Sequence, residues 1–432
     1  MSPDGAEPAS PISPLRPGLD VWIEGQRIGT LRVVENGWQL RYDPGWLAHP
    51  SCFAISPHLP LRPEPIVDEP EDRRVQWFFD NLLPEGGVRE ALARHARVAA
   101  DDAFGLLARF GRESAGALTL LPEGARPPAA GAYHPLATGE LRRLLDELPR
   151  VPLIAAGGLA RMSLAGAQHK LGLHRRERTF LLPEHAASSL VIKPDNARPE
   201  LFPFCPANEH FCVSLARRVG LDAPRSELLH LPEPVYLVER FDRRIDQSGS
   251  VERLHQIDLC QLLNRWSGYK YEAEGGITFE QTFGALDRTR QPAVSRNQLL
   301  RRLIFNYVIG NSDAHAKNVA FLLSGAGLSL APAYDLLCVA VYGPDFDYMA
   351  MTIAEEVRYG WVEAQHWDRL GASLGVGPAF LRRLRTELGR SIPAAARTLL
   401  GDGVFTDAER GFLARVIAVI DRHAGYLLAG PG

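Results

Sequence analysis

The sequence predicts an α+β fold in which a small amino-terminal α/β cap precedes a β-rich lobe and a mostly helical carboxy-terminal lobe. Three observations support this prediction. Apolar and polar residues alternate in short runs between residues 19 and 42, as in half-buried strands. Short apolar runs return between residues 162 and 238, around one helical stretch. Beyond residue 255 the apolar spacing is mostly that of helices.

The composition is that of a folded protein with two or three domains. The chain has 432 residues, of which 46% are hydrophobic and 23% charged, and its net charge of −3 gives no overall attraction to nucleic acid or acidic lipid. Its five cysteines are scattered without a C-x-x-C pair, which indicates buried thiols in a reducing compartment. We find no signal peptide and no apolar run of about 18 residues, so we expect a cytoplasmic protein without membrane contact.

The amino-terminal part is expected to form a disordered arm and then the cap. Residues 1–18 are rich in Pro, Ser and Ala and lack large apolar residues. The cap should cover residues 19–125, beginning with a hairpin over 19–28 that turns at Glu-Gly. Its further elements are a strand at 38–42, helical spacing at 75–97 with a break at 83–87, and a helix at 101–110.

A Pro/Gly/Ala-rich segment at 122–135 predicts the boundary between the cap and the second lobe. The β-rich lobe should cover residues 136–250 and the helical lobe residues 251–432. The elements expected in the β-rich lobe are a helix at 138–148, strands at 162–175, 179–182, 189–193 and 235–238, and a helix at 207–219 that ends at Gly220.

The most informative polar cluster lies in NSDAHAKN, residues 311–318. It contains Asp313-x₄-Asn318, the spacing with which a catalytic Asp accepts a hydroxyl proton and an Asn binds Mg²⁺ in phosphoryl transfer. The cluster follows an apolar helix and precedes an apolar strand, which suits a rigidly held site. Taken alone, the spacing is more often that of a turn whose Asp and Asn merely cap a helix.

A second carboxylate strengthens the first interpretation. Asp335 follows Asn318 by seventeen residues (335 − 318), and an apolar hairpin at 319–330 lies between them. In protein kinases a metal-binding Asp follows the catalytic loop in this way. Mg²⁺ on a triphosphate needs only one or two protein oxygen ligands, which Asn318 and Asp335 would supply. The alternative is that Asp335 is another turn residue.

Lys193 ends the apolar strand LVIK, where a kinase places an ammonium against the α- and β-phosphates. The next helix carries Glu209, sixteen residues later (209 − 193), as a candidate ion-pair partner. A lysine at the end of a strand is also common as a solvated edge residue.

Two further segments have the composition of nucleotide contacts. The turn SLAGAQHK at 163–170 has small residues that would let backbone N–H groups approach phosphates, although a plain hairpin turn has the same composition. The connector ERFDR at 239–243 follows a strand and could meet an adenine through Phe241, which alternatively is a core residue. The predicted ATP-binding residues are Ser163, Gly166, Ala167, Gln168, Lys170, Lys193, Glu239, Phe241 and Asp242.

The order of these signals is more informative than any one of them. A phosphate turn, a strand Lys, a helix Glu, a connector, Asp-x₄-Asn, a hairpin and an Asp follow one another between Ser163 and Asp335. The sequence therefore predicts a protein-kinase-like bilobal fold and an ATP- and Mg²⁺-dependent kinase.

The chain also resembles the HipA family of serine/threonine kinases over nearly its whole length. The segments that carry the resemblance are FDNLLPEG (79–86), GAL (116–118), SLAGAQHK (163–170), VIKP (191–194), ERFDR (239–243), HQID (255–258) with Gln261, KYE (270–272) and NSDAHAKN (311–318). Two segments, 275–297 and 340–360, contribute no motif, and substrate recognition could differ there.

The resemblance implies roles for individual residues. Asp313 would be the catalytic base, with His315 near the transferred phosphate. Asn318 and Asp335 would bind Mg²⁺, and Lys193 and Lys170 would contact the nucleotide phosphates. Ser163 matches a phosphate-loop serine that such kinases autophosphorylate, which shuts the enzyme down.

The resemblance also implies a biological setting, that of a toxin in a toxin–antitoxin pair. The protein substrate would be an aminoacyl-tRNA synthetase, such as the glutamyl enzyme, whose phosphorylation stalls translation. A HipB-like helix-turn-helix antitoxin would neutralise the chain and connect it to operator DNA. Two alternatives remain open at this point: a kinase-like co-repressor scaffold that acts through the antitoxin, and a small-molecule kinase.

Overall fold

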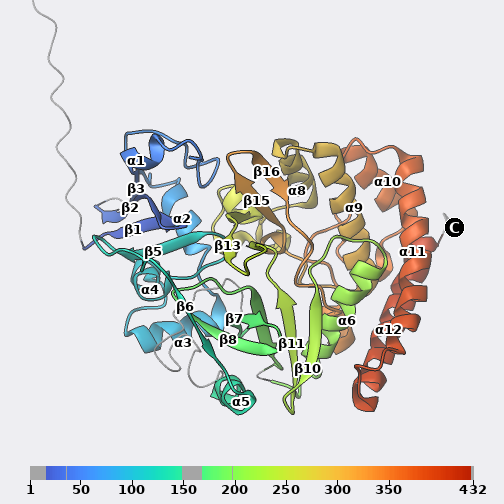
Figure 1. Cartoon of the computed structure of the whole chain (residues 1–432). Coiled ribbons are helices and arrows are strands. Elements are labelled where there is room, and N and C mark those ends of the chain that lie inside the picture. Colours follow the sequence, from blue (N-terminus) through green and yellow to red (C-terminus); the bar gives the residue numbers. More distant parts are fainter. Residues whose placement is uncertain (1–15, 36, 148–167, 197, 430–432) are drawn as a thin grey trace, which may run out of the picture.

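The fold is built from three antiparallel sheets of three or more strands, with long helices gathered on one side (Figure 1). This computed structural model describes residues 16–35, 37–147, 168–196 and 198–429. Most of the arm predicted at 1–18 lies outside the described residues. Within residues 16–18, the Arg16 guanidinium forms an ion pair with Asp102, at 2.8 Å.

The amino-terminal part is a five-stranded sheet packed against short helices. The strand order is β4-β3-β2-β1-β5. The predicted hairpin is present: β1 and β2 are joined by Glu24 and Gly25, both with positive φ, as a tight two-residue turn requires. The elements are β1 (Leu19–Ile23), β2 (Gln26–Val34), β3 (Gly37–Tyr42), α1 (Pro44–Leu47), β4 (Ile66–Val67), α2 (Arg74–Asp80), α3 (Gly86–Ala96), α4 (Ala103–Phe110) and β5 (Leu118–Pro122).

A six-stranded sheet follows, in the order β10-β11-β9-β7-β8-β6. Its central strands are buried on both faces, since Val235 and Leu237 pack with helix α5 residues while Tyr236 faces the core that includes helix α6. The elements are β6 (Ala132–Pro135), α5 (Thr138–Glu147), β7 (Leu171–Arg176), β8 (Thr179–Glu184), β9 (Leu190–Pro194), α6 (Cys205–Arg218), β10 (Ser226–His230) and β11 (Pro234–Glu239). Strand β6 lies in the segment predicted as a boundary.

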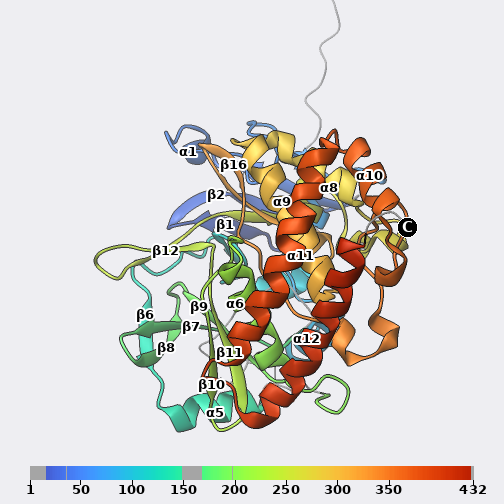
Figure 2. The ribbon, with the colours of Figure 1, turned by 90° about the vertical axis from the view of Figure 1, so that its right-hand side faces the viewer.

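The carboxy-terminal part is mostly helical, as predicted, and α9, α11 and α12 pack side by side at its edge (Figure 2). Two small sheets precede and interrupt the helices. The elements are β12 (Arg243–Ile245), β13 (Val251–Arg253), β14 (Gln256–Asp258), α7 (Leu259–Leu262), α8 (Phe279–Ala285), α9 (Pro292–Ile309), β15 (Ala320–Ser324), β16 (Gly327–Leu330), α10 (Ala364–Ser373), α11 (Pro378–Leu400) and α12 (Asp407–Leu428). Among the described residues, no helix is both long and apolar enough to cross a lipid bilayer.

The end of α9 sets the position of the NSDAHAKN loop. Gly310 follows the helix with φ +68°, and a Cβ there would lie 2.8 Å from the Ala340 Cβ. Only glycine combines this left-handed conformation with so close a neighbour. The chain therefore leaves α9 abruptly, and the polar loop is fixed between the helix and the β15–β16 hairpin.

Candidate active site

Lys193 and Glu209 form the ion pair that the sequence suggested. Lys193 lies on β9 and Glu209 on α6, and the Lys193 Nζ lies 2.8 Å from the Glu209 Oε1. Both side chains are buried, so the charges are withdrawn from solvent and depend on each other. The lysine is not a solvated edge residue.

Asp335 lies on the other side of the same ammonium. Its Oδ1 is 2.7 Å from the Lys193 Nζ, and its side chain is 38% exposed where that of Glu209 is 6% exposed. Asp335 therefore faces the open side of the cluster. Its backbone is left-handed, with φ +56°, and the Asn311 side chain donates to its carbonyl oxygen at 3.2 Å. A strained conformation of a non-glycine residue needs such support from its surroundings.

The charges in this cluster shift the pKa values of all its members. Burial alone would lower the pKa of Lys193, but Asp335 and Glu209 raise it above its ordinary value. Burial raises the pKa of Glu209 to about 7, against the influence of Lys193. Burial would also raise the pKa of Asp335, but Lys193 and Lys170 lower it to about 2. At neutral pH Asp335 is therefore ionised.

Asp313 is joined to Asp335 through short polar contacts. The Asn311 side chain that supports Asp335 also accepts from the Asp313 backbone N–H, at 3.3 Å. The Asn318 amide nitrogen donates to the Asp313 carbonyl oxygen at 2.7 Å. Lys193, Asp335, Asp313 and Asn318 thus lie in one connected cluster, although they come from a strand, a hairpin end and a loop.

The Asp313 carboxylate itself is held by two side chains that belong to different segments. The Tyr271 hydroxyl donates to its Oδ1 at 2.5 Å, and the His315 Nε2 lies 3.8 Å from the same oxygen. His315 is buried, and its Nδ1 has no hydrogen-bond partner among the described residues. Burial lowers the pKa of His315, with Asp313 opposing this change. A neutral imidazole is therefore favoured beside the carboxylate.

The residues predicted to bind a metal have the right chemistry for Mg²⁺. Among the described residues, no group of three or more His, Cys, Asp and Glu side chains could hold a metal ion. Asn318 and Asp335 offer an amide oxygen and a carboxylate oxygen, which are the hard ligands that Mg²⁺ prefers. The Asn318 amide nitrogen donates to Asp313, and its oxygen accepts no hydrogen bond from the described residues.

Of the ATP-binding residues predicted in the connector, Phe241 lies near the cluster and the Asp242 side chain does not. The Phe241 ring is 5.2 Å from that of Tyr334, the residue before Asp335. Glu239, the last residue of β11, donates its backbone N–H to the Arg225 carbonyl oxygen at 2.9 Å.

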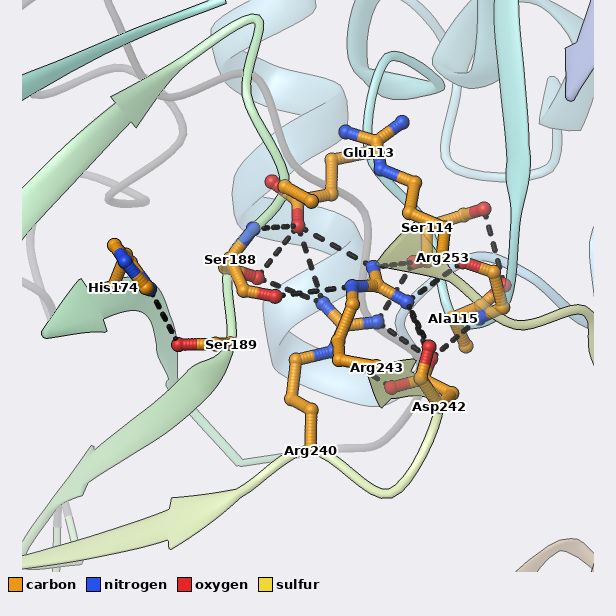
Figure 3. Close-up of polar contacts among 12 residues, drawn as sticks. Glu113, Ser114, Ala115, His174, Ser188, Ser189, Arg240, Asp242, Arg243 and Arg253 are labelled. Atoms are coloured by element: carbon orange, nitrogen blue, oxygen red, sulfur yellow. Dashed lines mark hydrogen bonds and ion pairs between the residues drawn. The ribbon is translucent and has the colours of Figure 1, made fainter. Parts of the chain in front are cut away.

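Asp242 belongs instead to a buried ionic network (Figure 3). Its carboxylate accepts from Arg240 at 2.7 and 2.9 Å and from the Gly116 backbone N–H at 2.7 Å. Burial would raise the pKa of Asp242, but Arg240 and Arg243 hold it well below its usual range. Both carboxylate oxygens are occupied, so this side chain supports the connector rather than a nucleotide.

The predicted phosphate turn is described only in part. Ser163, Gly166 and Ala167 lie outside the described residues, whereas Gln168 and Lys170 are described. Burial and the neighbouring Lys193 lower the pKa of Lys170 to about 8, while Asp335 opposes the change. Lys170 is therefore close enough to Lys193 and Asp335 for its charge to interact with both.

Three residues of the site were given no role from the sequence: Tyr271, Lys317 and Glu85. Lys317 lies inside the NSDAHAKN loop and is buried, and its ammonium contacts Asp258 at 2.9 Å and the Asn81 side chain at 2.8 Å. Glu85 pairs with Lys270 and lies 3.6 Å from Lys317. The only available signal was that each belongs to a segment that carries the family resemblance.

A sheet lysine paired with a helix glutamate, followed by an Asp-x₄-Asn loop, a hairpin and an Asp, defines a protein-kinase-like fold. Family models agree with this class: the HipA N-terminal domain matches residues 19–121 and the HipA-like C-terminal domain matches residues 162–396. The chain belongs to the HipA family. The predicted α+β, protein-kinase-like fold is confirmed.

Individual relatives cover most of the chain. Y4mE of Sinorhizobium fredii is 37% identical over 393 residues, which cover 89% of this chain and 92% of the relative. The serine/threonine-protein kinase toxin HipA of Shewanella oneidensis is 28% identical over 429 residues, which cover 95% of this chain and 96% of the toxin. A solved complex of Shewanella oneidensis HipA, HipB and operator DNA matches with a TM-score of 0.81 at 26% identity, over 94% of this chain and 96% of that one.

Proposed function

We propose that this chain is an ATP- and Mg²⁺-dependent protein kinase that phosphorylates serine or threonine. The observation that carries the proposal is the buried Lys193 ammonium between Glu209 and Asp335, connected through Asn311 to the Asp313 loop. Phosphoryl transfer needs positioning and charge neutralisation more than covalent chemistry, and this cluster offers both.

Each residue has a role that follows from its surroundings. Asp313 accepts the proton of the substrate hydroxyl, because its carboxylate is half exposed and oriented by Tyr271. Lys193 and Lys170 neutralise nucleotide phosphates, and the connector at Glu239 and Phe241 receives the adenine. Asn318 and Asp335 hold Mg²⁺, which when bound neutralises charge on the phosphate oxygens.

We further propose that the chain is the toxin of a toxin–antitoxin pair. Its relative in Shewanella oneidensis is named a kinase toxin, and the solved relative is complexed with HipB and operator DNA. By the same relation, the partner of this chain is a HipB-like helix-turn-helix antitoxin, which connects it to operator DNA. The substrate proposed from the resemblance is an aminoacyl-tRNA synthetase such as the glutamyl enzyme, and Ser163 is the proposed site of autophosphorylation.

Replacing Asp313 tests the proposal directly. Asp313→Asn removes the proton acceptor and keeps the shape of the side chain, so phosphate transfer from γ-labelled ATP to the synthetase or to Ser163 should fall about 100- to 10,000-fold. The matched control is Asp368→Asn, an exposed carboxylate in the same lobe, which should leave the rate unchanged. The rates are compared only between variants whose melting temperatures are equal, so that a loss of rate does not reflect unfolding.

Full phosphate transfer by the Asp313→Asn variant would refute the proposed base. Phosphoproteomics after induced expression, with the Asp313→Asn chain as the baseline, identifies the substrate. A phosphorylated synthetase supports the toxin proposal. Transfer only to small molecules would replace it with the second alternative from the sequence.

A further inference from the structure

A groove of about 660 Å³ lies between the amino-terminal sheet domain and the helical lobe. One wall comes from α2, α3 and the residues up to Asp101, and the other wall comes from residues 266–274. Both walls carry aromatic residues, including Trp77 and Trp266. No role proposed above uses this groove as a whole.

The groove is one side chain away from the proposed catalytic base. The Tyr271 side chain lines it while the Tyr271 hydroxyl donates to Asp313. Tyr271 is followed by Glu272, whose carboxylate accepts from the Thr352 backbone N–H at 2.7 Å and from its hydroxyl at 2.8 Å. This wall is therefore anchored to the segment that follows Asp335. When a hydroxyl of a polypeptide reaches Asp313, the residues beside that hydroxyl lie next to the groove.

Trp266 is placed in the groove by its own neighbours. The residue is 47% exposed, and its indole N–H donates to Asp80 at 3.2 Å. The ring lies over Gly268, where a Cβ would come within 2.3 Å of the Trp266 ring. An exposed tryptophan with a fixed orientation is typical of residues that dominate protein–protein binding. Its face also attracts cations and the aliphatic stems of lysine and arginine.

The unpaired charges of the groove are acidic on balance. Arg89 pairs with Asp80 at 2.8 Å, and Lys270 pairs with Glu85, so these four charges neutralise one another. Asp101 and Glu274 are exposed, and neither has an ion-pair partner within the described parts of the chain. Arg73 is the remaining cation, and it donates to Gln76. Two free carboxylates against one arginine favour a cationic occupant.

We propose, on the basis of the kinase function above, that this groove docks a segment of the protein substrate with lysine or arginine residues beside the phosphoacceptor hydroxyl. Trp266 packs against the stems of these residues, and Asp101 and Glu274 pair with their charges. The groove thus selects the sequence around the hydroxyl, while the Lys193–Asp335 cluster handles the nucleotide.

Two fluorescein-labelled peptides test the docking site on the full chain. Both contain one central serine, flanked by lysine and arginine in one peptide and by glutamate in the other, and binding is followed by fluorescence anisotropy. We expect the basic peptide to bind at least about tenfold more tightly. Asp101→Lys combined with Glu274→Lys should remove this preference, and Trp266→Ala should weaken the basic peptide about tenfold. Glu64→Lys with Asp368→Lys, two exposed acids outside the groove, should change nothing.

Phosphate transfer from ATP to the same peptides separates the two proposals. Binding of the basic peptide without any transfer would support the docking site and count against the kinase function. Transfer with equal affinity for both peptides would refute the docking site and leave the kinase function standing. An unchanged preference in the Asp101/Glu274 double variant would also refute the docking site.

Discussion

At the scale of single residues, the surroundings of the Lys193 ammonium suit the binding of an anionic ligand. Its ammonium has two carboxylate partners, of which Glu209 is enclosed and Asp335 faces the open side. Glu209 keeps the lysine in place, whereas under the proposed function Asp335 would exchange it for a metal ion when phosphates bind. The lysine would then move from one anion to another without losing its charge compensation, which avoids the cost of an unpaired buried cation.

Lys193→Met tests this role. Methionine keeps the aliphatic stem and removes the charge, and Glu209 can become neutral because burial already raises its pKa to about 7. We expect the fold to persist and the affinity for ATP to fall about 100-fold, since losing one partner of a buried charged pair costs about 2–5 kcal/mol. Calorimetric titration with ATP measures the change. The control is Lys270→Met, which removes a lysine paired with Glu85; a similar loss there would contradict the assignment.

Tyr271 gives a second prediction at this scale. Its hydroxyl orients the Asp313 carboxylate, so Tyr271→Phe removes one charge-assisted hydrogen bond worth about 1.5–3 kcal/mol. We expect kcat to fall about tenfold while the KM for ATP stays the same, because Tyr271 contacts Asp313 and, within the described residues, makes no hydrogen bond to Lys193, Glu209 or Asp335. Steady-state kinetics measure the two constants separately. A rise in the KM for ATP at constant kcat would show that the tyrosine acts on nucleotide binding instead.

At the scale of elements, the connector after β11 is fixed by the network of Figure 3. Arg240 and Arg243 reach the Glu113 carboxylate at 3.3 and 3.4 Å, and Glu113 also accepts from the Ser188 backbone N–H at 2.8 Å. The connector, the residues just before β9 and the amino-terminal domain therefore meet at one buried point. The proposed adenine contacts at Glu239 and Phe241 flank this point, so the network positions them.

Asp242→Asn should destabilise the protein strongly. The change leaves Arg240 and Arg243 buried with one counter-charge fewer, and breaking a buried pair in this way costs about 3–5 kcal/mol. Thermal unfolding measures the loss as a lower Tm. Asp246→Asn, on the exposed loop between β12 and β13, is the control and should leave the Tm nearly unchanged. Equal Tm values for the two variants would show that the network does not stabilise the fold.

Elements with local signals were predicted well. The β1–β2 hairpin, the two parts of the helical stretch at 75–97, helix α6 and the β15–β16 hairpin are where periodicity and turn residues placed them. Strand β6 was missed because its four residues, AYHP, contain no alternation of buried and exposed positions and depend on pairing with β8. Strand β14 has three residues and pairs with β15, about sixty positions later, so no local pattern reveals it.

The residues of the candidate site likewise fall into two groups: those that local sequence patterns predict, and those that only the fold brings together. Lys193, Asp313, Asn318 and Asp335 were found because each follows or precedes a recognisable apolar element. Tyr271 and Lys317 act through partners that are 42 and 236 positions away, Asp313 and Asn81, and such contacts leave no trace in local spacing. Asp242 was assigned to the nucleotide because it stands in the connector, but its direction is set by Arg240 and Gly116, which only the fold brings together.

At the scale of the whole molecule, the amino-terminal domain helps to hold the NSDAHAKN loop in place. Lys317, next to Asn318, donates to the Asn81 carbonyl oxygen at 3.1 Å and to its side chain. His255, at the start of the helical lobe, contacts the Ile55 carbonyl oxygen through its Nε2 at 2.8 Å. Loss of the contacts between the amino-terminal domain and the helical lobe would therefore also remove contacts that hold the loop.

Acid should weaken the contact between the amino-terminal domain and the helical lobe by favouring protonation of His255. Burial lowers the pKa of His255 to about 4, although its hydrogen bond to Ile55 opposes the change. In the unfolded chain the pKa is about 6.5, so between pH 6.5 and 4 the unfolded state binds a proton that the folded state refuses. The contribution of His255 to the free energy of unfolding is therefore fully present above pH 6.5. It declines as the pH falls towards 4, by up to about 1.4 kcal/mol per pH unit.

The prediction is measured as Tm between pH 8 and pH 5. The Tm of the natural chain should fall below pH 6.5, and His255→Asn should reduce the slope while His49→Asn, an exposed histidine in the amino-terminal domain, should not. His210 and His423 also have pKa values lowered to about 4 by burial, so part of the slope should remain in the His255 variant. An identical slope in the natural chain and the His255 variant would show that this contact between the amino-terminal domain and the helical lobe is not sensitive to protons.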